Sequence, residues 1–301
     1  MPLGLITKAL SGYYYVLPDE HPHASPIQCR ARGLFKMKGL TPLVGDHVVF
    51  SETENGEGTV EELLPRSTEL IRPPIANVDT ALLVFAVTEP GLTLSLLDKF
   101  LVHTERAGLQ SIICLSKYDL LDNADDELMG RITTIQAYYS KIGYTVLLCS
   151  VKTGIGMEEV KLALSGRKTV FSGQSGVGKS SLINQLLPEL NIETNEISNR
   201  MGRGKHTTRH VEFIRHPNDG WIADTPGFSQ LDFTGIEAEE LSDCFVEMGS
   251  RKRSCKFRGC LHRSEPDCAV IEAVESGAIK QSRFEHYLQF LEEIRERRPR
   301  Y

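Results

Sequence analysis

The stretch Gly173 to Ser180 constrains the fold of this chain most, because it matches the phosphate-binding pattern G-x-x-x-x-G-K-S. It follows a β-branched and aromatic run at 168–171 and precedes residues 181–187, whose apolar side chains recur at helical spacing. A glycine-rich turn between a strand and a helix points backbone N–H groups and the positive end of the helix dipole at one anion. The context therefore predicts a nucleoside triphosphate site rather than a chance glycine-rich turn.

Two side chains of this loop have separate expected roles. Lys179 is expected to reach the β- and γ-phosphates, where it also serves catalysis, and Ser180 is expected to ligate Mg²⁺. The other residues expected to contact the nucleotide here are Gly173, Gln174, Ser175, Gly176, Val177, Gly178 and Ser181.

Length and composition exclude several classes of protein. With 301 residues, 41% of them hydrophobic and 25% charged, the chain has room for two or three ordinary globular domains. No apolar run approaches the ~18 residues of a membrane span, and the N-terminus lacks a signal-peptide pattern. Seven cysteines favour a reducing cytoplasm with one metal site over a disulfide framework. The net charge of −6 requires any nucleic-acid surface to be local.

Residues 1–70 are predicted to form a small β-barrel of the five-stranded OB type. Five strand-like runs occur at 5–10, 13–17, 28–35, 46–50 and 58–64, separated by Gly, Pro and Asn. Tyr13, Tyr14 and Tyr15 either offer a face for stacking bases or pack into the barrel. Residues 66–77 are expected to form a linker.

Residues 71–232 alternate between strand and helix patterns, which predicts a parallel α/β sheet. The run 78–87 is continuously apolar, as in a strand buried on both faces. Further strands are expected at 111–115, 144–149 and 168–171, and helices at 92–107, 125–140 and 157–164.

Two loops that follow strands of this region predict a guanine pocket. Asp119 can accept hydrogen bonds from N1–H and N2–H₂ of guanine, a donor pair that adenine lacks, so it would select GTP over ATP. Its alternative role is that of a turn or N-cap residue. The first loop contains Ser116, Lys117, Tyr118 and Asp119, and the second loop contains Ser150, Val151 and Lys152.

The Mg²⁺ and γ-phosphate side is expected downstream of the phosphate loop. Asp224 follows a short strand and would hold Mg²⁺ through water, while the Gly227 N–H would contact the γ-phosphate. The basic segment 199–210 contains Thr207 and Thr208, one of which is expected to ligate Mg²⁺ when a γ-phosphate orders the loop. The same basic loop is also suited to contacting RNA phosphates.

Residues 233–301 change to helix, cysteine and basic patterns and are predicted to form a helical zinc-binding domain. Three sulfurs and one imidazole within fourteen residues complete a tetrahedral set, which predicts a structural zinc site rather than unrelated buried thiols. The four predicted ligands are Cys255, Cys260, His262 and Cys268. Five cations in 251–258 and four arginines near the C-terminus suit a phosphate backbone, although basic residues also stabilise a helix end.

These motifs resemble those of a Ras-like GTPase in a circularly permuted order: base loops first, then the phosphate loop and the two switches. With a small barrel before them and a zinc motif after them, the chain resembles the bacterial small ribosomal subunit biogenesis GTPases over nearly its full length. That resemblance implies a monomeric cytoplasmic enzyme that binds the 30S subunit and its 16S rRNA, and hydrolyses GTP to GDP during late subunit maturation. The alternative is a GTP-sensing, RNA-binding checkpoint protein with negligible turnover.

Two positions depart from the usual GTPase patterns. Ser116 stands where the family mostly has Asn, and its shorter side chain is expected to lose one of two bonds that link the base to the phosphate loop. Phe228 follows Gly227 where Ras has a water-orienting Gln. The resemblance implies that His206 orients the attacking water instead; otherwise His206 contacts RNA.

Overall fold

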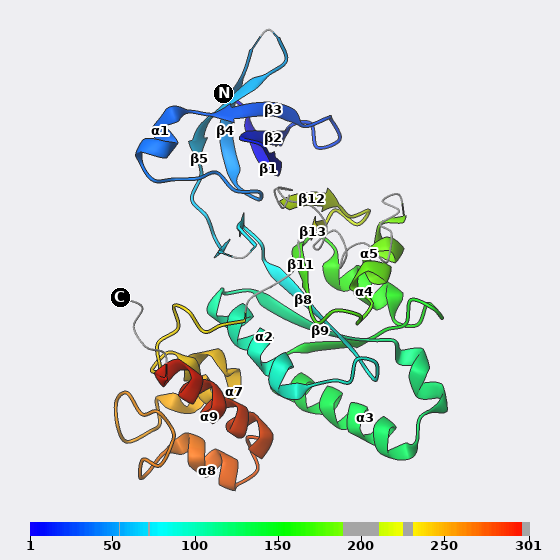
Figure 1. Cartoon of the computed structure of the whole chain (residues 1–301), viewed down its shortest axis with the longest axis vertical. Coiled ribbons are helices and arrows are strands. Elements are labelled where there is room, and N and C mark those ends of the chain that lie inside the picture. Colours follow the sequence, from blue (N-terminus) through cyan, green and yellow to red (C-terminus); the bar gives the residue numbers. More distant parts are fainter. Residues whose placement is uncertain (54, 72, 189–210, 225–230, 297–301) are drawn as a thin grey trace.

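The computed structural model describes residues 1–53, 55–71, 73–188, 211–224 and 231–296 (Figure 1). The predicted site residues His206, Thr207, Thr208 and Gly227 lie outside these ranges. No helix within the described ranges is long and apolar enough to cross a membrane.

The N-terminal strands close into a five-stranded barrel, which confirms the predicted class. Strand order is β1-β2-β3-β5-β4, and β4 pairs again with β1. The strands are β1 (Leu3–Leu10), β2 (Tyr13–Pro18), β3 (Ile27–Ala31), β4 (His47–Glu52) and β5 (Gly58–Leu63). A strand was expected at 28–35, and its predicted C-terminal boundary is wrong. Strand β3 ends at Ala31, and a short helix, α1 (Gly33–Met37), follows. Burial of Phe35 against the barrel core accounts for that turn of helix.

The central region is a sheet with helices on both faces. Its order is β10-β9-β8-β11-β13-β12, and all neighbours are parallel except β12 with β13. The strands are β8 (Thr80–Ala86), β9 (Gln110–Ser116), β10 (Thr145–Leu148), β11 (Lys168–Ser172), β12 (Val211–Arg215) and β13 (Trp221–Asp224). The helices are α2 (Leu94–Arg106), the 3₁₀ helix η1 (Tyr118–Asn123), α3 (Asp126–Lys141), α4 (Met157–Leu164) and α5 (Lys179–Leu186).

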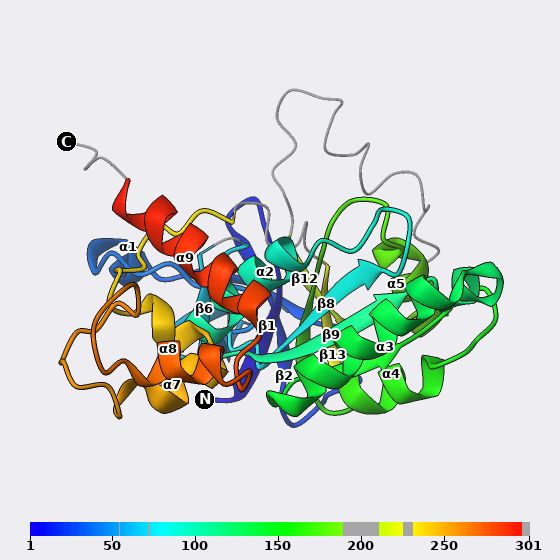
Figure 2. The same cartoon turned by 90° about the horizontal axis from the view of Figure 1, so that it is seen from below.

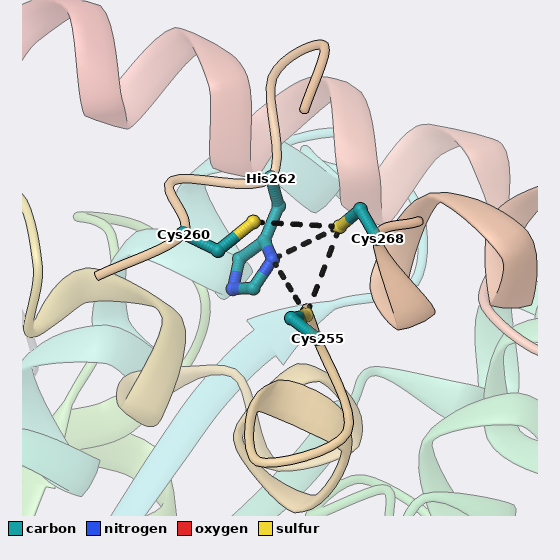
Figure 3. Close-up of side chains that lie close together, drawn as sticks. All are labelled: Cys255, Cys260, His262 and Cys268. Atoms are coloured by element: carbon teal, nitrogen blue, oxygen red, sulfur yellow. Dashed lines mark hydrogen bonds between the residues drawn. The ribbon is translucent and has the colours of Figure 1, made fainter. Parts of the chain in front are cut away.

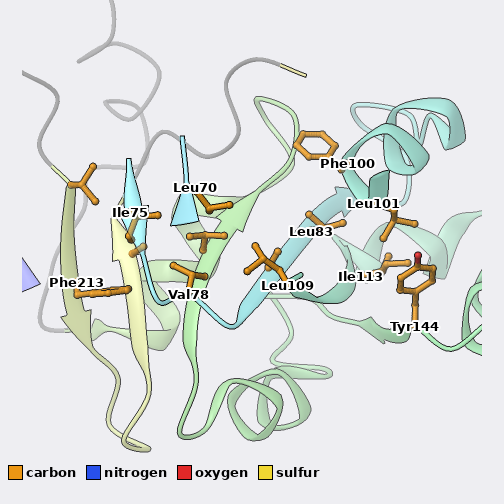
Figure 4. Close-up of a cluster of buried hydrophobic side chains, with 14 of the residues drawn as sticks. Leu70, Ile75, Val78, Leu83, Phe100, Leu101, Leu109, Ile113, Tyr144 and Phe213 are labelled. Atoms are coloured by element: carbon orange, nitrogen blue, oxygen red, sulfur yellow. The ribbon is translucent and has the colours of Figure 1, made fainter. Parts of the chain in front are cut away.

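Strand β8 shows how the apolar sequence divides between two cores. Leu83 and Phe85 point to the core that contains α2 and α3, whereas Leu82 and Val84 point to the core that contains α4 and α5. Alternate side chains of a strand face opposite sides of its sheet, so a strand buried on both faces is apolar throughout. Figure 4 shows Leu83 beside Phe100 and Leu101 of α2.

The order of the sheet reveals a permuted connection. Strand β11 lies between β8 and β13, although β8, β9 and β10 all precede it in the chain. In the chain, the strands that end in the base loops therefore come before the strand that ends in the phosphate loop. In the sheet, that later strand lies beside β8.

The barrel continues this sheet instead of standing apart from it. Strand β1 pairs antiparallel with β12, with Lys8 opposite Glu212 and their side chains 2.8 Å apart. The segment expected to be a linker contains a short antiparallel pair, β6 (Glu69–Leu70) and β7 (Ile75–Ala76). Gly45 of the barrel has φ +94° and lies so close to this pair that a Cβ would sit 1.9 Å from the Ala76 carbonyl oxygen. The predicted linker is thus packed against the barrel.

The C-terminal region forms a helical layer against α2, as Figure 2 shows. Its elements are the 3₁₀ helix η3 (Leu241–Cys244), α7 (Val246–Lys252), α8 (Ala269–Glu275) and α9 (Gln281–Arg295). Val102 of α2 belongs to the same buried cluster as Phe245 and Phe290.

Candidate nucleotide site and metal centre

The phosphate-binding segment occupies the turn between β11 and α5, at the carboxyl edge of the parallel sheet. Gly173 has φ +142°, and a Cβ there would lie 2.0 Å from the Val84 carbonyl oxygen of β8. Gly178 is the N-cap of α5 with φ +94°. Both positions need glycine, one for close packing on β8 and both for their positive φ. The glycines therefore shape the loop and orient the start of α5.

Lys179 turns its ammonium group back into this loop. Its Nζ donates hydrogen bonds to the carbonyl oxygens of Gly173, at 2.8 Å, and of Gln174. Burial lowers the pKa of the Lys179 amine to about 8, because charging it there costs solvation. Phosphate oxygens in this loop would restore a strong partner for the ammonium group and raise its pKa again.

Binding of Mg·GTP at pH 8 is therefore expected to take up about half a proton per site, since an amine with a pKa of about 8 is half deprotonated there. Near pH 6.5 the amine is already charged and the uptake should vanish. Affinity should consequently fall as the pH rises above 8. Calorimetric titration in two buffers of different protonation enthalpy measures this uptake. A Lys152→Gln variant should retain it, and zero uptake in the unmodified protein at pH 8 would contradict the assignment to Lys179.

The two predicted base loops meet around one cavity of about 310 Å³ beside the phosphate-binding segment. Ser150 Oγ donates a hydrogen bond to Asp119 Oδ1 at 2.6 Å, and Lys152 Nζ lies 3.9 Å from Asp119 Oδ2. Lys117, in a left-handed conformation, donates from Nζ to the Glu89 carbonyl oxygen after β8. The cavity is lined by Ser116, Lys117, Asp119, Leu120, Cys149, Val151, Lys152, Val177, Gly178, Ser181 and Leu182.

Three lining residues were missed by the sequence reasoning: Leu120, Leu182 and Cys149. Cys149 is buried, with its sulfur 3.2 Å from that of Cys114. Its position directly after β10 and before Ser150 was the signal available in the sequence. Tyr118, which was predicted to contact the nucleotide, donates its backbone N–H to the Cys149 carbonyl oxygen at 3.0 Å and so joins the two loops.

Ser116 links the first base loop to the phosphate-binding segment. Its buried hydroxyl lies 2.6 Å from the Val177 carbonyl oxygen and 3.2 Å from the Phe85 carbonyl oxygen. One hydroxyl donates one hydrogen, and the shorter distance assigns that hydrogen to Val177. The bridge to the phosphate-loop backbone is therefore present even though serine is shorter than asparagine.

Replacing Ser116 by alanine is expected to weaken GTP binding about two- to tenfold, because one buried hydrogen bond contributes about 0.5–1.5 kcal/mol. Ser116→Asn is the matched control, since its amide N–H can donate to the same carbonyl and should keep the affinity. Titration with a fluorescent GTP analogue measures both variants. Equal affinity of the alanine variant and the unmodified protein would show that the bridge does not support the nucleotide site.

The structure describes only part of the predicted Mg²⁺ side. Ser180 lies in the first turn of α5, next to Lys179, and Asp224 is the last residue of β13, where its backbone pairs with Glu212. The strands that carry the two motifs, β11 and β13, are parallel neighbours, so Ser180 and Asp224 follow the same edge of the sheet.

A Cys3His cluster gathers in the turn-rich segment between α7 and α8 (Figure 3). The ligand atoms of Cys255, Cys260, His262 and Cys268 all lie within 4.8 Å of one another. His262 Nδ1 is 3.2 Å from Cys268 Sγ and 3.6 Å from Cys255 Sγ, and Cys268 Sγ is 3.7 Å from Cys260 Sγ. A tetrahedral zinc with Zn–S of about 2.3 Å and Zn–N of about 2.0 Å has ligand–ligand edges of this size. The donor set and its spacing are compatible with zinc.

Neighbouring groups hold this turn in place. The Glu265 carboxylate accepts backbone N–H bonds from Leu261 at 2.8 Å and from Arg263 at 2.7 Å. The Tyr287 hydroxyl of α9 donates to the Leu261 carbonyl oxygen at 2.8 Å. The ligands are thus positioned by the helical layer as well as by one another.

A permuted sheet with a phosphate-binding loop and two base loops around one cavity defines a circularly permuted GTPase. The family model for RsgA GTPase matches residues 63–234, and that for the RsgA N-terminal domain matches residues 3–60. The chain belongs to the RsgA family and is a GTPase.

Relatives match the chain along its whole length. It is 52% identical to "Small ribosomal subunit biogenesis GTPase RsgA" of Bacillus subtilis strain 168, and 50% identical to the protein of that name from Geobacillus kaustophilus, with 100% of each chain covered. The crystal structure of YloQ, described as a circularly permuted GTPase, superposes with a TM-score of 0.86 at 46% identity, covering 100% of this chain and 97% of that one. YjeQ from Thermotoga maritima gives 0.87 at 35% identity, with 99% of both chains covered.

Proposed function

We propose that this chain binds the small ribosomal subunit in its GTP form and assists late maturation of that subunit in the cytoplasm, with GTP hydrolysis stimulated by the subunit. The observation that carries the proposal is the full-length similarity to proteins named for small-subunit biogenesis, at 50–52% identity, in a chain whose base and phosphate loops meet around one cavity. The exposed cations of the zinc-binding segment support contact with 16S rRNA, because phosphate contacts dominate nucleic-acid affinity.

The decisive experiment measures GTP turnover with and without purified 30S subunits. The proposal requires a higher rate with subunits, and co-sedimentation with them in the presence of a non-hydrolysable GTP analogue. Absence of both effects would contradict it. Binding without any stimulated turnover would instead favour the checkpoint alternative.

Within the site, Asp119 is proposed to select guanine while Ser150, Val151 and Lys152 close over the base. Lys179 would compensate the charge of the β- and γ-phosphates. Mg²⁺, which GTPases generally require, would be held by Ser180, Thr208 (or Thr207) and Asp224, and the Gly227 N–H would contact the γ-phosphate.

His206 is proposed to orient the attacking water, because the phenyl ring of Phe228 cannot hold water by hydrogen bonds. Single-turnover hydrolysis by His206→Ala should be slowed by about 10²-fold or more, the usual contribution of a positioned acid–base group. His210→Ala, in the same basic segment, is the control and should keep the rate. Equal rates for His206→Ala and the unmodified protein would remove His206 from catalysis.

The Cys3His cluster is proposed to hold one structural zinc, because four protein ligands leave no open position for a substrate. Metal analysis should find one zinc per chain, and Cys260→Ser should lose it and lower the melting temperature. Cys244→Ser changes a cysteine of the same helical layer outside the cluster and should retain the metal. Retention of zinc by the Cys260 variant would contradict the assignment.

The chain is further proposed to act as a monomer built of three units: 1–70, 71–232 and 233–301. Light scattering coupled to gel filtration tests the monomer, and limited proteolysis tests the boundaries. A mass of twice 33.6 kDa would contradict the monomer.

A further inference from the structure

The first turn of the metal cluster carries an exposed phenyl ring at its tip. Phe257 is 47% exposed, and it lies between Cys255 and Cys260, two of the four cluster residues. Of the Phe, Tyr and Trp side chains that the structure describes, it alone falls in the exposed class. Gly259, two residues further along this turn, has φ +74°. A phenyl ring in water on a short turn contributes nothing to a core, and its flat face is free to stack on a planar group such as a base.

Cationic residues flank this ring in the sequence. Lys256 Nζ lies 5.8 Å from the ring centroid and also pairs with the Asp267 carboxylate. Arg253 and Arg258 are both exposed, and neither forms an ion pair with any residue inside the described ranges. The tip therefore combines a flat apolar surface with an excess of positive charge, on a chain whose net charge is −6.

The turn is held before any ligand arrives. Its two ends are cluster residues, and the Lys256 backbone N–H donates to the Asp267 carbonyl oxygen at 3.3 Å. The ring is therefore presented from a constrained loop and needs little further ordering when it makes a contact.

We propose that this tip binds single-stranded RNA by stacking one unpaired base on Phe257, while Arg253, Lys256 and Arg258 contact the flanking phosphates. A π-face accepts any base, and cations on either side of it match a backbone with one charge per nucleotide. Paired bases do not expose a free face, so the tip distinguishes unpaired segments from duplex. An apolar peptide would use the ring but leave the cations without partners. The proposal rests on the proposed function only for the source of the RNA.

The test uses the full-length zinc-loaded protein and a ten-nucleotide RNA of alternating adenosine and cytidine, which cannot pair with itself, beside its duplex with the complementary strand. Phe257→Leu keeps an apolar side chain without a π-face and should weaken single-strand binding roughly five- to a hundredfold. It should leave duplex binding within about twofold, because the phosphate contacts remain. Phe257→Tyr keeps an aromatic ring and should bind the single strand as tightly as the unmodified protein does. Arg258→Gln should weaken both RNAs similarly and reduce the salt dependence of binding.

Direct evidence of stacking comes from Phe257→Trp in a Trp221→Phe background, where the one tryptophan should be quenched by the single strand but not by the duplex. Unchanged single-strand affinity in Phe257→Leu, or an equal loss for both RNAs, would overturn the proposal. Loss of 30S binding in Phe257→Leu with unchanged oligonucleotide binding would assign the tip to a protein partner and also overturn it. Failure of 30S subunits to stimulate the unmodified protein would refute the proposed function and leave the oligonucleotide result standing.

Discussion

Replacing Asp119 by asparagine is expected to lower the affinity for GTP by about 10² to 10⁴-fold, and to make xanthosine triphosphate the preferred ligand. The carboxylate can accept from both N1–H and N2–H₂ of guanine, and each hydrogen bond to a charged group contributes about 1.5–3 kcal/mol. An asparagine amide presents one acceptor and one donor. That pair mismatches guanine but matches xanthine, which carries a carbonyl oxygen in place of the exocyclic amine.

The surroundings of Asp119 make this substitution informative. Its carboxylate is 11% exposed and is fixed by Ser150 Oγ, which in turn accepts the Thr153 N–H at 3.2 Å. Lys152 is 80% exposed, so its pairing with Asp119 across 3.9 Å contributes little. The hydrogen bonds of Ser150, more than the charge of Lys152, therefore fix the position of the Asp119 carboxylate.

Competition between labelled GTP and unlabelled nucleotides measures the change in preference. The matched control is Asp122→Asn, on the same 3₁₀ helix with an exposed side chain, and it should bind GTP as the unmodified protein does. Unaltered GTP affinity in Asp119→Asn would place the base elsewhere. Loss of GTP affinity without any gain for xanthosine triphosphate would indicate damage to the pocket.

What could be predicted from the sequence was local. The phosphate-binding segment, the two base loops and the Cys3His cluster each lie within fourteen residues or fewer, so strand ends and ligand spacing were enough to predict them. The permutation could be read as well, because it is an order of motifs along the chain.

The contacts that could not be predicted from the sequence join residues far apart in the chain. The pairing of Lys8 with Glu212 joins the barrel to the sheet, yet neither strand pattern specifies its neighbour at an edge. The link from Ser116 to Val177 spans 61 residues and depends on β9 lying two strands from β11. Arg283 belongs to the C-terminal helix, for which the sequence pattern supported expectations only about the arginines at its end, but it is 2% exposed and bonded to a carboxylate 185 positions away.

That buried arginine joins the helical layer to the GTPase sheet. Arg283 Nη1 donates to Asp98 Oδ1 at 2.6 Å, and its Nε and Nη2 donate to the two oxygens of Glu247 at 2.7 and 2.9 Å. Asp98 lies on α2, Glu247 on α7 and Arg283 on α9. The Tyr139 hydroxyl of α3 also donates to Asp98 Oδ1, at 2.5 Å. Four helices thus meet at one ionic network.

Arg283→Met is therefore expected to destabilise the protein by about 3–5 kcal/mol. The change removes the cation paired with the buried Glu247 carboxylate, and it leaves Asp98 with His286 Nδ1, 2.5 Å away, as its nitrogen partner. Chemical denaturation at neutral pH measures the loss. Adding Asp98→Asn and Glu247→Gln to Arg283→Met should recover most of it, since neutral amides no longer need a countercharge. The control is Arg106→Gln, which breaks the exposed pair of Arg106 with Glu240 between α2 and the helical layer and should cost at most about 1 kcal/mol.

Arg283→Met is also expected to change the number of unfolding transitions. The network ties the helical layer to α2, so in the unmodified protein the two should unfold together, whereas Arg283→Met should release the layer in a separate, earlier transition. A single transition in the variant, or a loss below about 1 kcal/mol, would show that apolar packing around Val102 holds the layer without the arginine. If the loss is as large as expected, any nucleotide-driven movement of the layer must either carry α2 with it or break this network. Because breaking it is costly, α2 is expected to move as one body with the helical layer.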